Sequence, residues 1–137
     1  MAPRELIFDH DEISVYYYPE IGIVHHKMHK PCRGSSFQTA LTKGAEIIET
    51  HGAHKWLSDD RKNYVLSPGD EEFGARVWFP RVRKAGWSHW AVVRPEQAVA
   101  QLNVGRFIKM FGELGVETIF VSDFDEAWTW LVEAKAE

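Results

Sequence analysis

The sequence has a single cysteine, Cys32, in 137 residues, so no disulfide can form within the chain. Secreted domains of this size often depend on disulfide pairs, and their absence here indicates a reducing compartment. The N-terminal residues lack the apolar segment of a signal peptide, and no run approaches the ~18 apolar residues that a membrane span needs. We therefore expect a cytoplasmic protein without a membrane span.

An excess of positive charge is also missing. The chain has 16 Lys and Arg against 20 Asp and Glu, a formal net charge of −4. Nucleic-acid-binding domains concentrate Lys and Arg on one face, and anionic membranes attract basic segments. Neither nucleic acid nor a membrane surface is an expected partner.

The known catalytic signatures are absent as well. The sequence has no Walker loop, no Gly-rich dinucleotide loop and no Gly-x-Ser-x-Gly elbow. These absences remove the commonest nucleotide cofactors and the α/β-hydrolase mechanism, and we expect no cofactor.

The chain does have enough hydrophobic residues to form a core. Hydrophobic residues make up 45% of the sequence, and six of them are tryptophan. A chain of this length buries roughly two thirds of the surface that its unfolded form exposes. The composition is typical of one folded domain, and we expect residues 1–137 to form it.

Periodicity predicts an order of strands and helices. Three β-rich segments open the chain, and helices then alternate with single strands. The strands are expected at residues 4–8, 12–18, 21–28, 54–58, 88–93 and 116–121. The pattern predicts an α/β fold with a mixed sheet, in which an antiparallel N-terminal hairpin precedes βα repeats and helices pack around the sheet.

Local signals place the helices. Phe37, Leu41, Ala45 and Ile48 recur on one face of a helix that ends at Gly52. Ser67 and Pro68 have the N-cap and first-turn chemistry of a second helix, which Pro80 is expected to break or kink.

Two more helices close the pattern. Pro95 is expected in the first turn of one, with Val99, Leu102, Phe107, Phe111 and Leu114 on one face. Asp123 is expected to cap the last helix, in which Phe124, Ala127, Trp128 and Leu131 share a face.

This order of elements resembles the SpoIIAA-like (STAS) fold family, in particular its less characterised bacterial branch. The resemblance covers residues from about 12 to 134 and includes the segments KWLSDD and FVSDFDEAWTWL. The best-known members are anti-sigma-factor antagonists with a phosphorylated serine in an Asp-Ser-Ser or Asp-Ser-Thr motif at a helix N-terminus. Ser67 is near the matching place, but Val65 and Leu66 precede it instead of Asp. A more distant relation to CRAL-TRIO lipid-transfer proteins implies a role with an apolar ligand.

A polar rim is the first candidate site. Asp59, Asp60 and Arg61 follow a strand, and Ser67 and Arg94 follow at neighbouring loops. Ligands of open α/β sheets bind outside the carboxyl ends of strands. The plainer interpretation is that the two acids cap turns and pair with Arg61 or Arg94, and we favour it. A magnesium site that adds Asp123 is a minor alternative.

The histidines and the cysteine do not have the arrangement of a metal site or of a reactive thiol. On a strand His25 and His26 point to opposite faces, and His29 lies roughly 13 Å from His25, too far to share one zinc ion. We therefore interpret the histidines as solvated surface residues and expect no metal. Cys32 has no base beside it in sequence and is interpreted as a passive residue at a helix start.

The aromatic residues leave two interpretations open. Trp78, Trp87 and Trp90 crowd one helix end and one strand start, either as core or as a partly exposed interface. In a carrier, aromatic and Met side chains would line a closed pocket. The residues expected there are Phe73, Trp78, Phe107, Met110 and Phe111.

Three functions follow, in order of preference. The first is a non-enzymatic binding or regulatory module, expected to be a homodimer, that meets a protein partner or small ligand at the polar rim. The second is a carrier or sensor of a small apolar molecule or lipid. The third is an enzyme that uses the acidic pair or Cys32, which ranks last because no nucleophile, base and electrophile come together.

Overall fold

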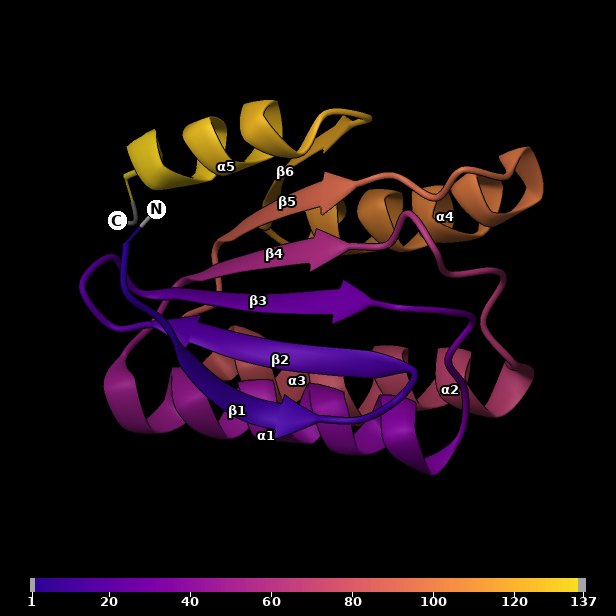
Figure 1. The fold of residues 1–137 in the computed structure, drawn as a ribbon, viewed down its shortest axis with the longest axis horizontal. Coiled ribbons are helices and arrows are strands. Elements are labelled where there is room, and N and C mark those ends of the chain that lie inside the picture. Colours follow the sequence, from indigo (N-terminus) through magenta and orange to yellow (C-terminus); the bar gives the residue numbers. More distant parts are fainter. Residues whose placement is uncertain (1, 136–137) are drawn as a thin grey trace.

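The computed structural model describes residues 2–135 and contains one six-stranded sheet (Figure 1). The spatial order β1-β2-β3-β4-β5-β6 equals the order along the chain. β1, β2 and β3 pair antiparallel, and β3 to β6 pair parallel. The strands are β1 (Glu5–Asp9), β2 (Ile13–Tyr18), β3 (Ile23–Met28), β4 (Lys55–Asp59), β5 (His89–Val93) and β6 (Glu117–Val121). The predicted mixed sheet with an antiparallel N-terminal hairpin is confirmed.

Helices cover the two faces of the sheet unequally (Figure 1). They are α1 (Ser35–His51), α2 (Pro68–Glu72), η1 (Phe73–Trp78), α3 (Phe79–Lys84), α4 (Ala98–Glu113) and α5 (Phe124–Glu133). The helices that connect parallel strands lie on one face because successive crossovers keep the same hand. α5 packs on the opposite face against β4, β5 and β6. In the described chain, no helix has the length and apolar character to cross a membrane.

Alternation along the strands divides the core into two clusters. Val24 and Trp56 belong to the larger cluster under the crossover helices, whereas Ile23 and Leu57 belong to the smaller one under α5. Successive side chains of a strand point to opposite faces, so each of the strands β2 to β6 contributes residues to both clusters.

α1 follows its sequence pattern closely. The predicted face of Phe37, Leu41, Ala45 and Ile48 is buried. Gly52 ends the helix in the left-handed conformation with φ of 67°, and its N–H donates to the Ile48 carbonyl. Both features depend on residues close in sequence, which is why periodicity predicts them.

The second helical segment runs from Pro68 to Lys84 without a break at Pro80, where the sequence predicts a break or a kink. Ser67 caps it as predicted, since its side chain accepts the Asp70 N–H at 3.3 Å. Before Pro80 the helix widens into the π-helical η1, in which the Phe79 N–H reaches the Gly74 carbonyl five residues back. We attribute the continuity to this wider turn, because an α-helical turn would press a carbonyl against the proline ring.

The expectation for α4 was partly wrong. The helix begins at Ala98 rather than at Pro95, because the preceding backbone is bonded elsewhere: Arg94 N–H donates to the Val121 carbonyl at 2.8 Å. The face that packs on the sheet contains Ala100, Val104, Phe107 and Phe111. Three residues expected on that face are exposed instead, and they are Val99, Leu102 and Leu114.

The tryptophans near α3 are core residues. Trp78, Trp87 and Trp90 are each at most 8% exposed, and neighbouring rings meet edge to face at 5.0 and 5.6 Å between centroids. Such contacts suit the charge distribution of aromatic rings. The interpretation of these three residues as an exposed interface is therefore wrong.

Candidate functional site

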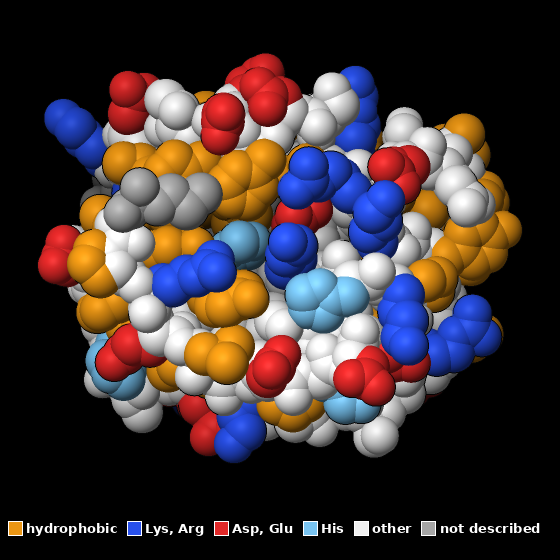
Figure 2. Space-filling model, in the orientation of Figure 1, with side chains coloured by type: hydrophobic (Ala, Val, Ile, Leu, Met, Phe, Trp, Pro, Cys, Tyr) orange, Lys and Arg blue, Asp and Glu red, His pale blue; other side chains and the backbone are white. Residues whose placement is uncertain are grey.

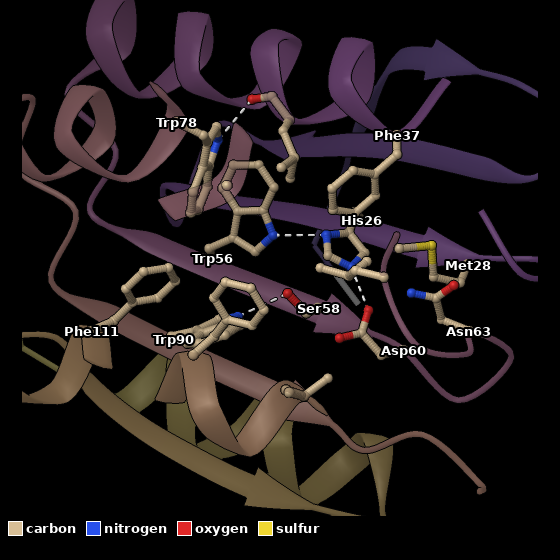
Figure 3. A pocket seen from close by; sticks show the side chains of 15 residues that line it. His26, Met28, Phe37, Trp56, Ser58, Asp60, Asn63, Trp78, Trp90 and Phe111 are labelled. Carbon is tan, nitrogen blue, oxygen red and sulfur yellow. Dashed lines mark hydrogen bonds and ion pairs between the residues drawn. The ribbon is translucent and has the colours of Figure 1, made fainter. Parts of the chain in front are cut away.

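A cavity lies between the sheet and the crossover helices (Figure 3). β3, β4 and β5 form one wall, and α1, η1 and α4 close the other side. The space open to the centres of water-sized spheres is about 70 Å³. This is space for several water molecules or for a small ligand.

The cavity wall is mostly apolar, and six aromatic rings form a large part of it. The rings that line it are Phe37, Trp56, Trp78, Trp90, Phe107 and Phe111. Each indole N–H is already bonded within the protein: Trp56 to His26 Nδ1 at 3.0 Å, Trp78 to the Leu41 carbonyl at 2.9 Å, and Trp90 to Ser58 Oγ at 2.8 Å. These rings consequently offer carbon surface, and no indole donor, to the cavity.

Polar side chains also line the cavity, and they are His26, Ser58, Asp60 and Asn63. His26 Nε2 and Asp60 Oδ1 lie 2.7 Å apart (Figure 3). An indole N–H only donates, so the bond from Trp56 makes His26 Nδ1 an acceptor. The proton of the neutral imidazole then lies on Nε2 and is donated to Asp60. Both nitrogens of His26 are thus engaged.

Gly74 leaves space at the helical side of the cavity. It lies in η1 and lines the cavity, and a Cβ built on it would meet no atom within 4 Å. Most protein interiors are packed without such gaps. The missing side chain at this position is therefore one reason why the cavity exists.

The structure does not bring all five residues of the predicted polar rim to one site. Asp60 lines the cavity, whereas Asp59 lies on the α5 side and pairs with Arg61 through bonds of 2.9 and 2.7 Å. Ser67 serves as an N-cap, and the Arg94 guanidinium lies 5.9 Å from the centre of the Phe120 ring. The expected turn pairing of Asp59 with Arg61 is confirmed, but Asp60 pairs with His26 instead.

On the α5 face, no helix covers β1 to β3 beside α5 (Figure 1), and Lys and Arg side chains gather near the middle of this face (Figure 2). A depression there is lined by Arg4, Tyr16, His25, Lys27, Asp59, Arg61 and Phe124. Arg61 is neutralised by Asp59, which leaves Arg4 and Lys27 as exposed cations.

The opposite orientation of His25 and His26 is as predicted, but their placement on the solvated surface is wrong: they are 3% and 5% exposed.

Burial of His25 predicts a pH dependence of stability. Desolvation lowers the pKa of His25 to about 3, and its Nε2 has no hydrogen-bond partner. The unfolded chain takes up this proton near pH 6.5 and the folded chain does not, so stability is full above that pH and falls as the pH drops toward 3. Between pH 7 and pH 5 we expect a loss of about 2 kcal/mol from this residue.

Urea denaturation of His25→Phe at both pH values measures this loss. The variant should lose about 2 kcal/mol less than the wild type between pH 7 and pH 5. The exposed His51, changed to Gln, is the matched control and should retain the wild-type dependence. Equal slopes for His25→Phe and the wild type would show that His25 does not cause the effect.

Three residues of the predicted apolar pocket line the cavity, and they are Trp78, Phe107 and Phe111. Phe73 packs against the edge of the core, and Met110 lies 39% exposed beside a surface depression outside the cavity. Sequence reasoning missed the contribution of the sheet. The alternation of His26 with Met28, and of Trp56, Ser58 and Asp60, is the signal that places these side chains on one face.

Cys32 is buried and has the chemistry of an unreactive thiol. Burial raises the pKa of Cys32 to about 11, and its Sγ lies 3.4 Å from Ser36 Oγ. At pH 8 we expect the folded protein to react with a thiol reagent at least about 100-fold more slowly than a free cysteine. Absorbance of released thionitrobenzoate measures the rate, and the urea-unfolded chain is the control. Rapid labelling of the folded chain would contradict the burial of a neutral thiol.

No His, Cys, Asp and Glu side chains in residues 2–135 form a group of three or more that could hold a metal ion. A scan against models of protein families, a search of curated proteins and a search of solved structures each returned no match. The resemblance to the STAS family therefore stays a prediction from the sequence.

Proposed function

We propose that the protein binds a small, largely apolar molecule in the aromatic cavity and acts as a carrier or sensor without catalysing a reaction. The observation that carries this proposal is the cavity itself, lined by six aromatic rings with Gly74 leaving room on the helical side. Ligand pockets are mostly apolar, with few polar groups that orient the ligand. An empty apolar cavity reduces stability, and a ligand that fills it offsets this cost.

The geometry supports this function better than a partner-binding rim. Most of the rim residues already interact within the chain, since Asp59 pairs with Arg61 and Ser67 caps α2. It also supports binding better than catalysis. Both nitrogens of His26 are engaged, so this imidazole is not available as a general base.

Titration with toluene tests the proposal. A ligand that binds only the folded state raises its stability by RT ln(1 + [L]/Kd), about 2.7 kcal/mol at 100-fold excess over Kd. We expect a saturable rise in Tm and a change in tryptophan emission, because Trp56, Trp78 and Trp90 line the cavity. Unchanged Tm and emission up to the solubility limit of toluene, and of other apolar probes of similar size, would overturn it.

We also propose that the chain forms a homodimer through the outer face of α4. Leu102 is 73% exposed, and Val99 lies one turn before it with 47% exposure. Neighbouring exposed aliphatic side chains favour an interface, and symmetric dimers are the commonest assemblies. Sedimentation velocity should give a dimer for the wild type and a monomer for Leu102→Asp. A monomeric wild type at high concentration would rule the dimer out.

A further inference from the structure

In residues 2–135, no Lys or Arg side chain forms an ion pair with the carboxylate of Asp60. Asp60 is 6% exposed, and in residues 2–135 its side chain has one hydrogen-bond partner, His26. Neither Lys nor Arg pairs with it in that part of the chain or lines the cavity. Buried carboxylates are normally paired with a cation or bonded to several donors.

We propose that the ligand of the aromatic cavity is a small primary amine whose ammonium group binds Asp60. This inference rests on the proposed function and names the chemical class of the ligand. The ammonium would supply the missing counter-charge, and the apolar body of the amine would lie against the aromatic rings.

His26 cannot supply that charge while the observed bonds are kept. A protonated imidazole donates from both nitrogens, but His26 Nδ1 accepts the indole N–H of Trp56. Trp56 is 1% exposed and its ring packs against Gly44, and this packing holds the indole in the orientation of the observed bond. The histidine therefore approaches Asp60 as a neutral donor.

The other groups in the cavity suit an ammonium group as well. Ser58 Oγ accepts one N–H from Trp90, and Asn63 Oδ1 accepts one from the Cys32 backbone at 3.1 Å. Each oxygen retains a second lone pair, and an ammonium has three N–H donors to share among such acceptors. Aromatic faces attract cations in addition, most strongly when water is excluded.

Three ligands of nearly equal shape test this inference: cyclohexylamine, cyclohexanol and methylcyclohexane. Calorimetric or fluorescence titration of the wild type should show cyclohexylamine binding at least tenfold more tightly than methylcyclohexane. This ranking needs no variant, so it stands even if a substitution at position 60 prevents folding.

The variant Asp60→Asn removes the charge and keeps an oxygen for the His26 N–H. It should weaken cyclohexylamine binding at least tenfold and leave methylcyclohexane within about threefold of the wild type. Asp59→Asn is the matched control: it removes a neighbouring charge on the opposite face and should leave the affinity for cyclohexylamine unchanged.

The outcomes distinguish the amine inference from the proposed binding of an apolar molecule. If methylcyclohexane or cyclohexanol binds as tightly as the amine, or if Asp60→Asn binds the amine as the wild type does, the amine inference is wrong and the apolar site remains. If none of the three ligands binds, the proposed function itself fails.

Discussion

Gly74→Leu is expected to abolish binding of a small ligand and to raise the Tm of the protein. A Cβ at Gly74 meets no atom within 4 Å, and the residue lines the cavity from the helical segment η1. A leucine side chain placed there would occupy much of the 70 Å³ that the ligand needs. Burying it contributes about 1.5–3 kcal/mol, and replacing a helical glycine contributes about 0.5–1 kcal/mol more.

Differential scanning calorimetry and toluene titration of this variant measure both effects. Gly105→Leu is the matched control, because Gly105 lies in α4, has equal free space at its Cβ and does not line the cavity. The control should gain helix stability and retain ligand binding. A Gly74→Leu protein that binds toluene as the wild type does would place the ligand site elsewhere.

Gly44→Ala is expected to destabilise the protein by about 1–3 kcal/mol, although alanine is the better helix former. A Cβ at Gly44 would overlap the six-membered ring of Trp56 and press on Val24. Trp56 is 1% exposed, and its N–H is bonded to His26. The methyl group therefore forces either α1 away from the sheet or the indole into the cavity.

Urea denaturation at pH 7 gives the change in the free energy of unfolding. Gly105→Ala, whose Cβ meets open space, is the control and should gain about 0.5–1 kcal/mol. If Gly44→Ala gained stability to the same extent, the close contact between α1 and Trp56 would be wrong, and with it the position of one cavity wall.

The elements predicted correctly from the sequence depend on local chemistry. The face of α1 repeats every three or four residues, and the Ser67 cap involves Asp70 three residues later. The parallel pairing of β3 to β6 follows from the alternation of single strands with helices. The start of α4 could not be predicted in this way, because the Arg94 N–H is bonded to Val121, on a different strand.

The candidate site was predicted less completely, because it is built from long-range contacts. His26 interacts with Trp56 and Asp60, which lie 30 and 34 residues later in the chain. Alternation indicates that these side chains share a face of the sheet, but only the register of β3 on β4 brings them together. Trp78 and Phe107 were predicted as aromatic side chains near the helices, whereas the sheet wall opposite them was missed.

Binding of a small apolar molecule in the aromatic cavity can be seen in a crystal structure of the protein grown with saturating toluene. We expect electron density for one toluene molecule in the cavity, in contact with the rings of Trp56, Trp90 and Phe107. A cavity that holds only ordered water, or toluene bound at another place on the protein, would contradict this expectation.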